Sequence, residues 1–355
     1  MAYDFIVLGA TGQQGRIVSR DLLFNGYSVL MCGRDKSKAE KLLKEFNKAA
    51  FEFVDLRDEA LTLSVLRESG AKVAINCAEG DYNLSTMLLA GETGLHYLDL
   101  GSDHQMTEDQ FKAHEDFKKK GLTAITGCGS TPGVVSVMAR YAERQFDTID
   151  TVNVGFAWNA NMPIFVVPFS VESITEEFED EANMLVNGKF EWRKPKSNTE
   201  YFEYMEIGKQ KTFYTRHPEP TTFAKYFAPK GLKNCIVYSS FPDHSRQVLE
   251  MFGELGLDSG EPIKINNAEV KPVNVLTQVL KRIEMPEGYT EKEDLWMHMR
   301  GEKDGRAHEI KMDCIAATMK GWEDATCNID TGMPCSIMAQ FIKTGVIAER
   351  GVFAP

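Results

Sequence analysis

Short apolar runs alternate with amphipathic segments along the first third of the chain. The apolar runs predict buried strands at 5–8, 28–32, 51–54, 73–76, 96–99 and 122–125. The segments between them have apolar residues at helical spacing, which predicts helices at 13–24, 38–46, 59–68, 84–92 and 108–119. Strands and helices in this alternation predict a parallel sheet that helices cover on both faces. The predicted fold class is therefore α/β, a doubly wound sheet of the Rossmann type.

The pattern of the remaining chain is irregular. A long helix is predicted over 132–145, with Thr131 as its N-cap and Pro132 in its first position. Strand-like runs follow at 151–158, 202–207 and 234–239, and helix-like runs follow at 171–185, 246–255 and 273–282. This mixture predicts a second domain of the α+β class.

The first predicted strand leads directly into a glycine-rich loop that opens a helix. The loop reads Gly-Ala-Thr-Gly-Gln-Gln-Gly over residues 9–15. Gly9 permits a tight turn, Gly12 lets the backbone approach a pyrophosphate, and Gly15 allows the helix to pack closely on the strand. The exposed amides and the helix dipole favour a phosphate at this position. The loop therefore predicts a dinucleotide site, and the residues expected to contact the cofactor are Gly9, Thr11, Gly12, Gln13, Gln14 and Gly15.

The end of the second predicted strand bears on the choice of nicotinamide cofactor. An acidic residue at this place binds the ribose 2′-hydroxyl of NAD, whereas an arginine accepts the 2′-phosphate of NADP. Arg34 follows Gly33 directly, and Asp35 comes next. The guanidinium of Arg34 suits a phosphate, so we expect NADP. In the alternative, Arg34 stacks on the adenine or is exposed to solvent, and Asp35 serves NAD.

Further cofactor contacts are expected at the carboxyl ends of the third and fourth strands, where ligands bind in open α/β sheets. Asp55 follows the third strand, at the usual position of adenine contacts. Asn76, Cys77 and Ala78 follow the fourth strand, near the expected place of the nicotinamide-side ribose. We interpret Cys77 as a small packing residue rather than a nucleophile, because the sequence identifies no partner base.

Composition limits the remaining possibilities. Of the 355 residues, 43% are hydrophobic and 26% are charged, which is ordinary for a globular chain with a sizeable core. The formal net charge of −12 disfavours nonspecific binding to nucleic acid or to an anionic membrane. The seven cysteines form no C-x-x-C pair and no zinc-like spacing, so no metal is expected. The sequence shows neither a signal peptide nor an apolar run of about 18 residues, which predicts a soluble cytoplasmic protein.

The chain resembles the saccharopine dehydrogenase family, including its lysine 6-dehydrogenase and carboxynorspermidine dehydrogenase branches. Besides the glycine-rich loop, the resemblance rests on segments spread over nearly the whole chain. They are Tyr97-Leu-Asp99 with Gly127-Cys-Gly-Ser-Thr-Pro-Gly133, the His-Pro-Glu-Pro-Thr-Thr run at 217–222, the Phe-Pro-Asp-His run at 241–244 with the residues up to 256, and the stretch 325–334. Asp243 stands where the family has glycine, and residues 328–330 replace a more usual Ala-Arg-Thr.

The resemblance also implies how the chain divides into domains and how many copies assemble. It implies a dinucleotide-binding domain over 1–127 and an α+β domain over 128–322 that binds substrate and mediates dimerisation. A C-terminal segment over 323–355 is expected to return to the first domain, and the chain is expected to form a homodimer. The implied activity is hydride exchange between NAD(P) and a carbon that bears nitrogen, through an imine, on a small amino-acid substrate.

An imine reaction needs an acid/base group with a pKa near neutrality, and histidine suits this role. In the segments that resemble the family, His217 is the first candidate and His244 is the second. Glu219 is expected to orient His217 or to bind the substrate amine. The alternative is that both histidines are polar residues of a loop or of a dimer interface.

The carboxylate of an amino-acid substrate requires a cationic partner, and arginine binds carboxylates bidentately. Arg216 and Arg246 lie in or beside the matching segments, although either can instead form an ordinary surface ion pair. Asp99 is a further candidate for contact with substrate. Its alternative role is structural, as a cap on the turn that follows.

The leading functional hypothesis is an NADP-preferring amino-acid oxidoreductase of the saccharopine dehydrogenase type, acting on a CH–NH bond. The alternatives are lysine 6-dehydrogenase, which deaminates a CH–NH2 group oxidatively in lysine metabolism, and carboxynorspermidine dehydrogenase. A different class is a non-catalytic NADP-binding sensor, because the loop at 9–15 also resembles that of sensor proteins on the same fold. A sensor has no need of the segment at 217–222, which favours the enzyme.

Overall fold

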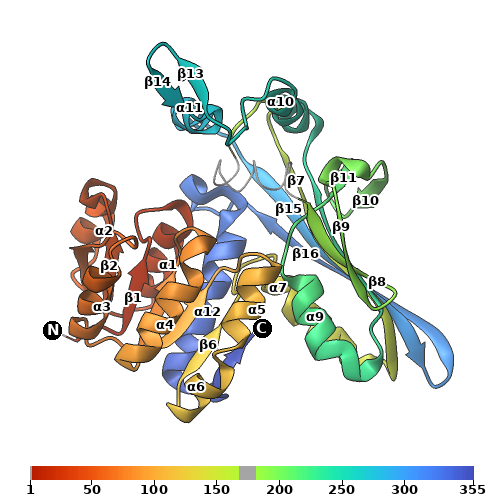
Figure 1. Ribbon diagram of the computed structural model, residues 1–355, viewed down its shortest axis with the longest axis horizontal. Coiled ribbons are helices and arrows are strands. Elements are labelled where there is room, and N and C mark those ends of the chain that lie inside the picture. Colours follow the sequence, from red (N-terminus) through yellow and green to blue (C-terminus); the bar gives the residue numbers. More distant parts are fainter. Residues whose placement is uncertain (1, 168–180) are drawn as a thin grey trace. The chain divides into compact units, whose positions relative to one another are not determined.

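The computed structural model describes residues 2–167 and 181–355 of the chain. The chain forms two compact units and passes between them several times. The first unit contains the residues up to Tyr141, together with His217–Tyr226 and Asn328–Pro355, and the second contains Ala142–Arg216 and Phe227–Cys327. Each unit has its own large sheet (Figure 1). Among the described residues, every helix is too short or too polar to cross a bilayer.

The sheet of the first unit is parallel throughout, and its strand order is β17-β6-β5-β4-β1-β2-β3. Its strands are β1 (Phe5–Leu8), β2 (Val29–Gly33), β3 (Ala49–Phe53), β4 (Val73–Asn76), β5 (His96–Asp99), β6 (Thr123–Ile125) and β17 (Gly351–Phe353). The helices between them are α1 (Gln13–Phe24), α2 (Glu40–Glu45), α3 (Glu59–Glu68), α4 (Asn83–Thr93), α5 (His104–Phe111) and α6 (His114–Lys119). The strand order reverses between β1 and β4, which is the switch point where doubly wound sheets bind ligands. The predicted fold class is confirmed.

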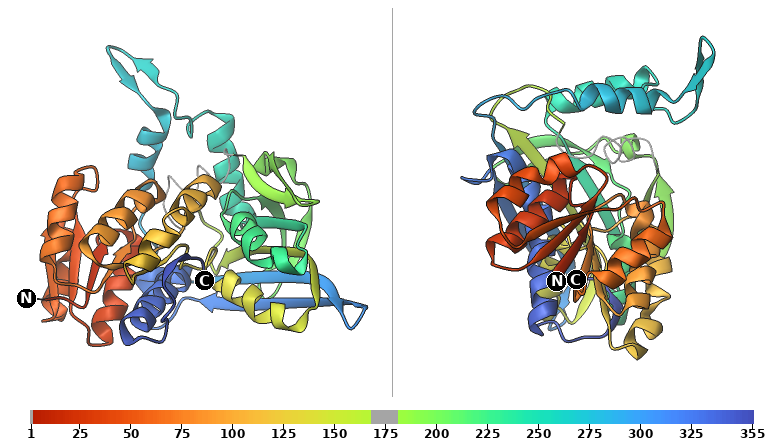
Figure 2. Two further views of the ribbon diagram at one scale, coloured as in Figure 1. Left: turned by 60° about the horizontal axis from the view of Figure 1, so that its bottom comes forward. Right: turned by 90° about the vertical axis from the view of Figure 1, so that its left-hand side faces the viewer.

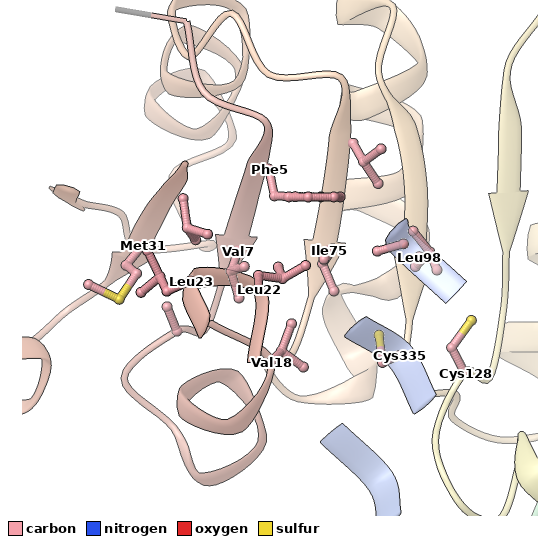
Figure 3. Packing of buried hydrophobic residues seen from close by; sticks show 14 of the residues in the cluster. Phe5, Val7, Val18, Leu22, Leu23, Met31, Ile75, Leu98, Cys128 and Cys335 are labelled. Atoms are coloured by element: carbon pink, nitrogen blue, oxygen red, sulfur yellow. The ribbon is translucent and has the colours of Figure 1, made fainter. Parts of the chain in front are cut away.

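Side chains alternate along these strands and divide the core of the first unit into two layers. On one face, Phe5, Val7 and Ile75 pack with residues of α1, α2 and α12 (Ile329–Thr344), as Figure 3 shows for part of this cluster. On the other face, Ile6 and Leu8 pack with residues of α3, α4 and α6. A strand covered on both faces needs apolar side chains on both, which is why these strands appear in the sequence as continuous apolar runs.

The end of the chain completes the first unit. β17 pairs in parallel with β6 and becomes the edge strand of the sheet. α12 packs beside α1, where the hydroxyl of Ser336 donates to the carboxylate of Asp21 at 2.6 Å. A Cβ atom on Gly332 would lie 2.5 Å from a side-chain carbon of Ile17, so the two helices approach closely only because this residue is glycine.

The sheet of the second unit is mixed, with the order β10-β11-β12-β7-β15-β16 and with β8 paired to β12 and β9. Its strands are β7 (Thr148–Ala160), β8 (Ala182–Val186), β9 (Lys189–Arg193), β10 (Tyr201–Tyr204), β11 (Gly208–Tyr214), β12 (Asn234–Ser240), β15 (Glu291–Lys303) and β16 (Arg306–Ala317). On one face of this sheet Val154 and Met297 are buried, and on the other Gly155 lies between Tyr238 and Trp296. The second unit also contains α10 (Asp243–Glu254), α11 (Pro272–Leu280) and a separate hairpin of β13 (Ile263–Ile265) and β14 (Ala268–Val270).

Some sequence-based predictions are wrong. The expected helix over 108–119 is two helices, α5 and α6. The helix expected over 132–145 is the shorter α7 (Val134–Ala142), so Pro132 precedes the helix and Thr131 is not its N-cap. Just before α7 the chain approaches itself closely, since a Cβ atom on Gly133 would lie 1.9 Å from the oxygen of Gly129. Of the helix expected over 171–185, residues 171–180 lie outside the described part. Its remainder forms β8, because pairing with β9 outweighs the helical spacing.

Candidate functional site

The glycine-rich loop lies between β1 and α1, where the sequence pattern predicts it. Gly9 has a φ of +72°, and a Cβ atom there would lie 2.6 Å from the backbone nitrogen of Ala78. A Cβ atom on Gly15 would lie 2.2 Å from the oxygen of Gly9, so the loop and helix require glycine at both places. Gly12 holds the N-cap position, and no side chain in the described part of the chain caps α1. An N-terminus of α1 that no side chain caps fits the pyrophosphate of a dinucleotide.

The two residues considered for cofactor choice have different surroundings at the end of β2. The carboxylate of Asp35 accepts hydrogen bonds from the amide of Ser37 at 3.0 Å and from its hydroxyl at 2.6 Å. These bonds hold the pKa of Asp35 below its usual range. Arg34 is exposed, and the preceding Gly33 contacts Thr11 of the loop. The carboxylate of Asp35 is thus hydrogen-bonded within its own turn, and the geometry favours Arg34 for contact with the cofactor.

A second arginine lies beside Asp55, just after β3. Arg57 donates to Oδ1 of Asp55 from its side-chain Nε at 2.9 Å and from its backbone amide at 3.1 Å. These bonds, with a smaller electrostatic contribution from Arg34, lower the pKa of Asp55 to about 2. The predicted cofactor contact Asp55 is therefore an ionised carboxylate held by Arg57. Arg57 was not among the predicted contacts.

The residues after β4 are held by internal bonds. Asn76 is fully buried and donates to the side-chain oxygen of Asn83 at 2.8 Å, while its own oxygen accepts from the amide of Ala78 at 3.2 Å. Burial raises the pKa of the Cys77 thiol well above its usual value, which favours the packing interpretation of this residue. The backbone of Cys77 and Ala78 lies against Gly9, so these two residues shape the loop through main-chain contact.

The contacts of Asp99 favour the structural role that was its alternative. Its side chain is fully buried, and Oδ1 accepts from the amides of Gly101 and Gly127, each at 2.9 Å. Oδ2 accepts from the side-chain amide of Gln110 at 2.7 Å. Burial raises the pKa of Asp99, although these bonds oppose the change. The geometry therefore favours a cap that joins the ends of β5 and β6 over contact with substrate.

A short segment from the second half of the chain brings a buried carboxylate into the first unit. Glu219 opens α9 (Glu219–Phe227), and its side chain is fully buried. Its Oε2 lies 3.3 Å from Nδ1 of His217, whose side chain is 13% exposed. Neither carboxylate oxygen of Glu219 accepts a hydrogen bond from the described residues. Because a buried carboxylate without hydrogen bonds is costly, the pair favours an added cationic or donor group.

A second histidine attaches the same segment to the first unit. Nδ1 of His104 lies 2.6 Å from the hydroxyl oxygen of Thr221. Further along α9, the hydroxyl of Tyr226 accepts a hydrogen bond from the amide of Ala354 at 3.2 Å. His104 opens α5, just beyond the carboxyl end of β5, so the segment is attached at the ligand-binding edge of the parallel sheet. The sequence does not indicate the contact between His104 and Thr221.

The remaining candidates lie in the second unit. The pKa of His244 is lowered by burial, and its ring meets that of Trp158 edge to face at 6.5 Å between centroids. Arg246 forms ion pairs with Asp243 at 3.0 Å and with Glu250 at 2.5 Å. The geometry of Arg246 therefore favours its alternative role in an ion pair. Arg216 is half-buried and directly precedes His217 in the chain, whereas His244 lies in α10 of the second unit.

Polar side chains at the start of α12 contact the loops of the first unit. The side-chain oxygen of Asn328 accepts from the side-chain amide of Gln14 at 2.9 Å. The hydroxyl of Thr331 lies 2.9 Å from that of Ser130. The helix thus connects the glycine-rich loop after β1 with the loop after β6. A glycine-rich loop at the switch point of a doubly wound sheet, with a buried histidine–glutamate pair in the same unit, is typical of an NAD(P)-dependent oxidoreductase.

Within this class the chain belongs to the saccharopine dehydrogenase family. Residues 5–125 match the family model of the saccharopine dehydrogenase NADP binding domain, and residues 129–355 match that of the saccharopine dehydrogenase C-terminal domain. Together these matches cover nearly the whole chain. The resemblance stated from the sequence is confirmed.

Several characterised relatives share most of this chain's length. The chain is 26% identical to a carboxynorspermidine synthase of Vibrio cholerae, over 98% of this chain and 88% of that protein. A carboxynorspermidine synthase of Vibrio alginolyticus is 25% identical over 92% of this chain and 84% of its own length. A carboxyaminopropylagmatine dehydrogenase of Synechocystis is 23% identical over 98% of this chain and 91% of its own length.

A solved structure confirms the fold. The apo saccharopine dehydrogenase (L-Glu forming) of Saccharomyces cerevisiae superposes on the chain with a TM-score of 0.76. The match covers 100% of this chain and 94% of that one, at 12% identity. At this identity the likeness supports the fold, while the substrate has to be argued from the site and the relatives.

Proposed function

We propose that this chain is an NADP-dependent oxidoreductase that acts on the CH–NH bond of a carboxylated polyamine, through an imine. The observation that carries the proposal is the buried pair of His217 and Glu219 in the same unit as the dinucleotide loop. The names of three relatives support the substrate class, because carboxynorspermidine and carboxyaminopropylagmatine are both amines with an added carboxyl group. Of the activities considered from the sequence, this choice favours the carboxynorspermidine dehydrogenase branch.

The cofactor would be held by the residues already described. The first amides of α1 would bind the pyrophosphate, and Arg34 would meet the 2′-phosphate. NADP is favoured over NAD because the carboxylate of Asp35 is occupied by Ser37. When bound, the reduced nicotinamide supplies a hydride to the imine carbon.

The proton of the reaction is assigned to His217. In the oxidative direction the amine carbon loses a hydride and the nitrogen loses a proton, which the His217 ring accepts. In the reductive direction the imidazolium returns this proton to the nitrogen. Glu219, with Oε2 3.3 Å from Nδ1, fixes the ring and stabilises its charged form. The charge of Glu219 acts strongly because the carboxylate is buried away from water.

The charge of the chain fits a polycationic substrate. The net charge of −12 favours the approach of a polyamine, and the carboxylate of Glu219 has capacity to accept hydrogen bonds from an ammonium group. For the substrate carboxylate, Arg216 is the candidate, because it directly precedes His217 in the segment that resembles the family. Arg246 forms ion pairs with Asp243 and Glu250. We also expect a cytoplasmic protein that acts as a homodimer.

The test is a substrate panel with the full chain. The protein is mixed with NADP⁺ at alkaline pH and with carboxynorspermidine, carboxyaminopropylagmatine, saccharopine or lysine, and reduction is followed by nicotinamide absorbance. We expect turnover with the carboxylated polyamines. Turnover with saccharopine or lysine alone would instead assign the chain to those activities. Tight nucleotide binding without turnover of any substrate would favour the sensor.

Substitutions test the residues assigned to catalysis. His217→Ala should lower kcat by roughly 100-fold or more, because general acid/base catalysis typically contributes that much. The matched control is His308→Ala, which removes a half-buried histidine of β16 in the second unit. An unchanged kcat in the His217 variant would remove this residue from the mechanism and leave the cofactor assignment intact.

A further inference from the structure

The hairpin of β13 and β14 is a small sheet that is separate from the main sheet of the second unit. Its strands pair with each other and with no other described strand. Asn266, in the turn, has a φ of +54°, which asparagine tolerates. The hairpin lies between α10 and α11 in sequence and extends away from them, as both views of Figure 2 show.

One face of the hairpin is apolar and exposed to solvent. The register places Ile263 opposite Val270 and Ile265 opposite Ala268, and residues directly opposite each other share a face of a sheet. Ile263 is 50% exposed and Ile265 is 48% exposed. An isolated two-stranded hairpin is marginally stable in water, and its open edges can pair with another strand. This hairpin therefore has the properties of an incomplete sheet.

The helices beside the hairpin in the sequence also expose apolar side chains. Met251 of α10 is 57% exposed, and Leu255, the C-cap residue of this helix, is 67% exposed at a spacing that puts both on one face. Val275 and Val279 of α11 are 47% and 52% exposed, with the same spacing. Exposed apolar side chains are thus found in the hairpin and in both helices that flank it in the sequence.

We propose that β14 pairs antiparallel with β14 of a second copy of this chain, about a twofold axis at Val270. This pairing would form a four-stranded sheet from two hairpins. The pattern of charge supports it, because in this register Glu269 of each copy faces Lys271 of the other. The backbone of Lys271 is extended, with φ −78° and ψ 123°, so it continues the strand up to Pro272. The two charge pairs would lie on the polar face, and the Val270 residues would meet on the apolar face.

The other edge of the hairpin is less suited to self-pairing. A twofold axis at Lys264 in β13 would place two lysines directly opposite each other, which is unfavourable. An axis at Ile263 would bring Pro262 into the ladder, and proline has no amide to donate. Self-pairing through β14 avoids the contact between lysines, and it brings a proline only to the end of the paired segment, where Pro272 lies opposite Ala268 of the other copy. The resulting sheet has the three or more strands that independent stability requires.

Cysteine cross-linking tests the axis. Directly opposite residues of antiparallel strands have Cα atoms about 4.5–5.5 Å apart, which is within the range of a disulfide. Val270→Cys should therefore form a covalent dimer under mild oxidation, seen on a nonreducing gel. The wild type and Lys264→Cys are controls, because the wild type has no cysteine here and residue 264 would lie on the outer strands. A dimer in light scattering without a Val270→Cys cross-link would overturn the proposal, as would a monomer.

Charge reversal tests the register independently of any new disulfide. Glu269→Lys alone, or Lys271→Glu alone, places like charges opposite each other and should raise the dimer dissociation constant by roughly tenfold. The double variant Glu269→Lys/Lys271→Glu exchanges the partners and should restore most of the affinity. Circular dichroism confirms that each variant is folded. Equal affinities in all variants, or a double variant weaker than both single ones, would refute the pairing.

Discussion

Asp294 is a buried carboxylate whose ionisation should set a pH dependence in the stability of the second unit. It lies on β15 and is fully buried. Its Oδ2 accepts from the amide of Met205 at 2.9 Å, whereas Oδ1 accepts no hydrogen bond from the described residues. Burial, with a further contribution from the charge of Asp313, raises the pKa of Asp294 to about 7. Since an unfolded aspartate has a pKa of about 3.9, the folded unit binds this proton more tightly than the unfolded chain.

The sign of the effect follows from this difference in pKa. Below about pH 4 the carboxyl group of Asp294 is protonated in both the folded and the unfolded chain, so its ionisation does not lower the free energy of unfolding. Between about pH 4 and about pH 7 the unfolded chain releases the proton while the folded unit retains it, so the free energy of unfolding falls. About 3 pKa units, at about 1.4 kcal/mol each, give a loss of about 4 kcal/mol that stays constant above pH 7. Asp294→Asn should remove this loss, and its amide oxygen can still accept from Met205.

Tryptophan fluorescence during urea unfolding measures this effect. The four tryptophans, Trp158, Trp192, Trp296 and Trp322, all lie in the second unit, so they report its unfolding separately from the first. The stability gained by Asp294→Asn over wild type should grow by about 4 kcal/mol between about pH 4 and about pH 8. The control is Asp304→Asn, an exposed turn residue with φ +51° that asparagine also adopts. A difference between Asp294→Asn and wild type that is the same at every pH would refute the reasoning.

Other predictions concern the first unit. Arg34→Ser should raise KM for NADPH by about 10- to 100-fold with little change for NADH, since a hydrogen bond to a charged group contributes about 1.5–3 kcal/mol; equal effects on the two cofactors in steady-state kinetics would contradict this role. Gly15→Val should abolish nucleotide binding in calorimetry, because even a Cβ atom would lie 2.2 Å from the oxygen of Gly9. Glu219→Gln should lower kcat and move the acid-side limb of the oxidative kcat–pH profile to lower pH, because it removes the negative charge that favours protonated His217; an unchanged profile would assign Glu219 a packing role.

The first unit could be predicted well from the sequence because its structure is encoded locally. Each buried strand is a short apolar run followed by a turn, and α1 spans Gln13–Phe24 as predicted. The second unit was harder to predict. β15 and β16 form a long hairpin that was not predicted. In β16, half-buried residues such as Ile310 and Met312 alternate with exposed polar ones, and this alternation is a strand signal that the prediction missed.

The candidate site was the part least accessible to sequence reasoning, since its contacts join distant residues. His104 and Thr221 are 117 positions apart, and no local pattern relates them. Glutamate is among the residues least often fully buried, so composition and periodicity place Glu219 on the surface. Its burial depends on the segment His217–Tyr226 packing into the unit that holds the dinucleotide loop. The distance between the histidine–glutamate pair and that loop is therefore set by packing within one unit. A substitution at the His104–Thr221 contact should consequently affect kcat more than stability, although neither residue is proposed to transfer a proton in the reaction.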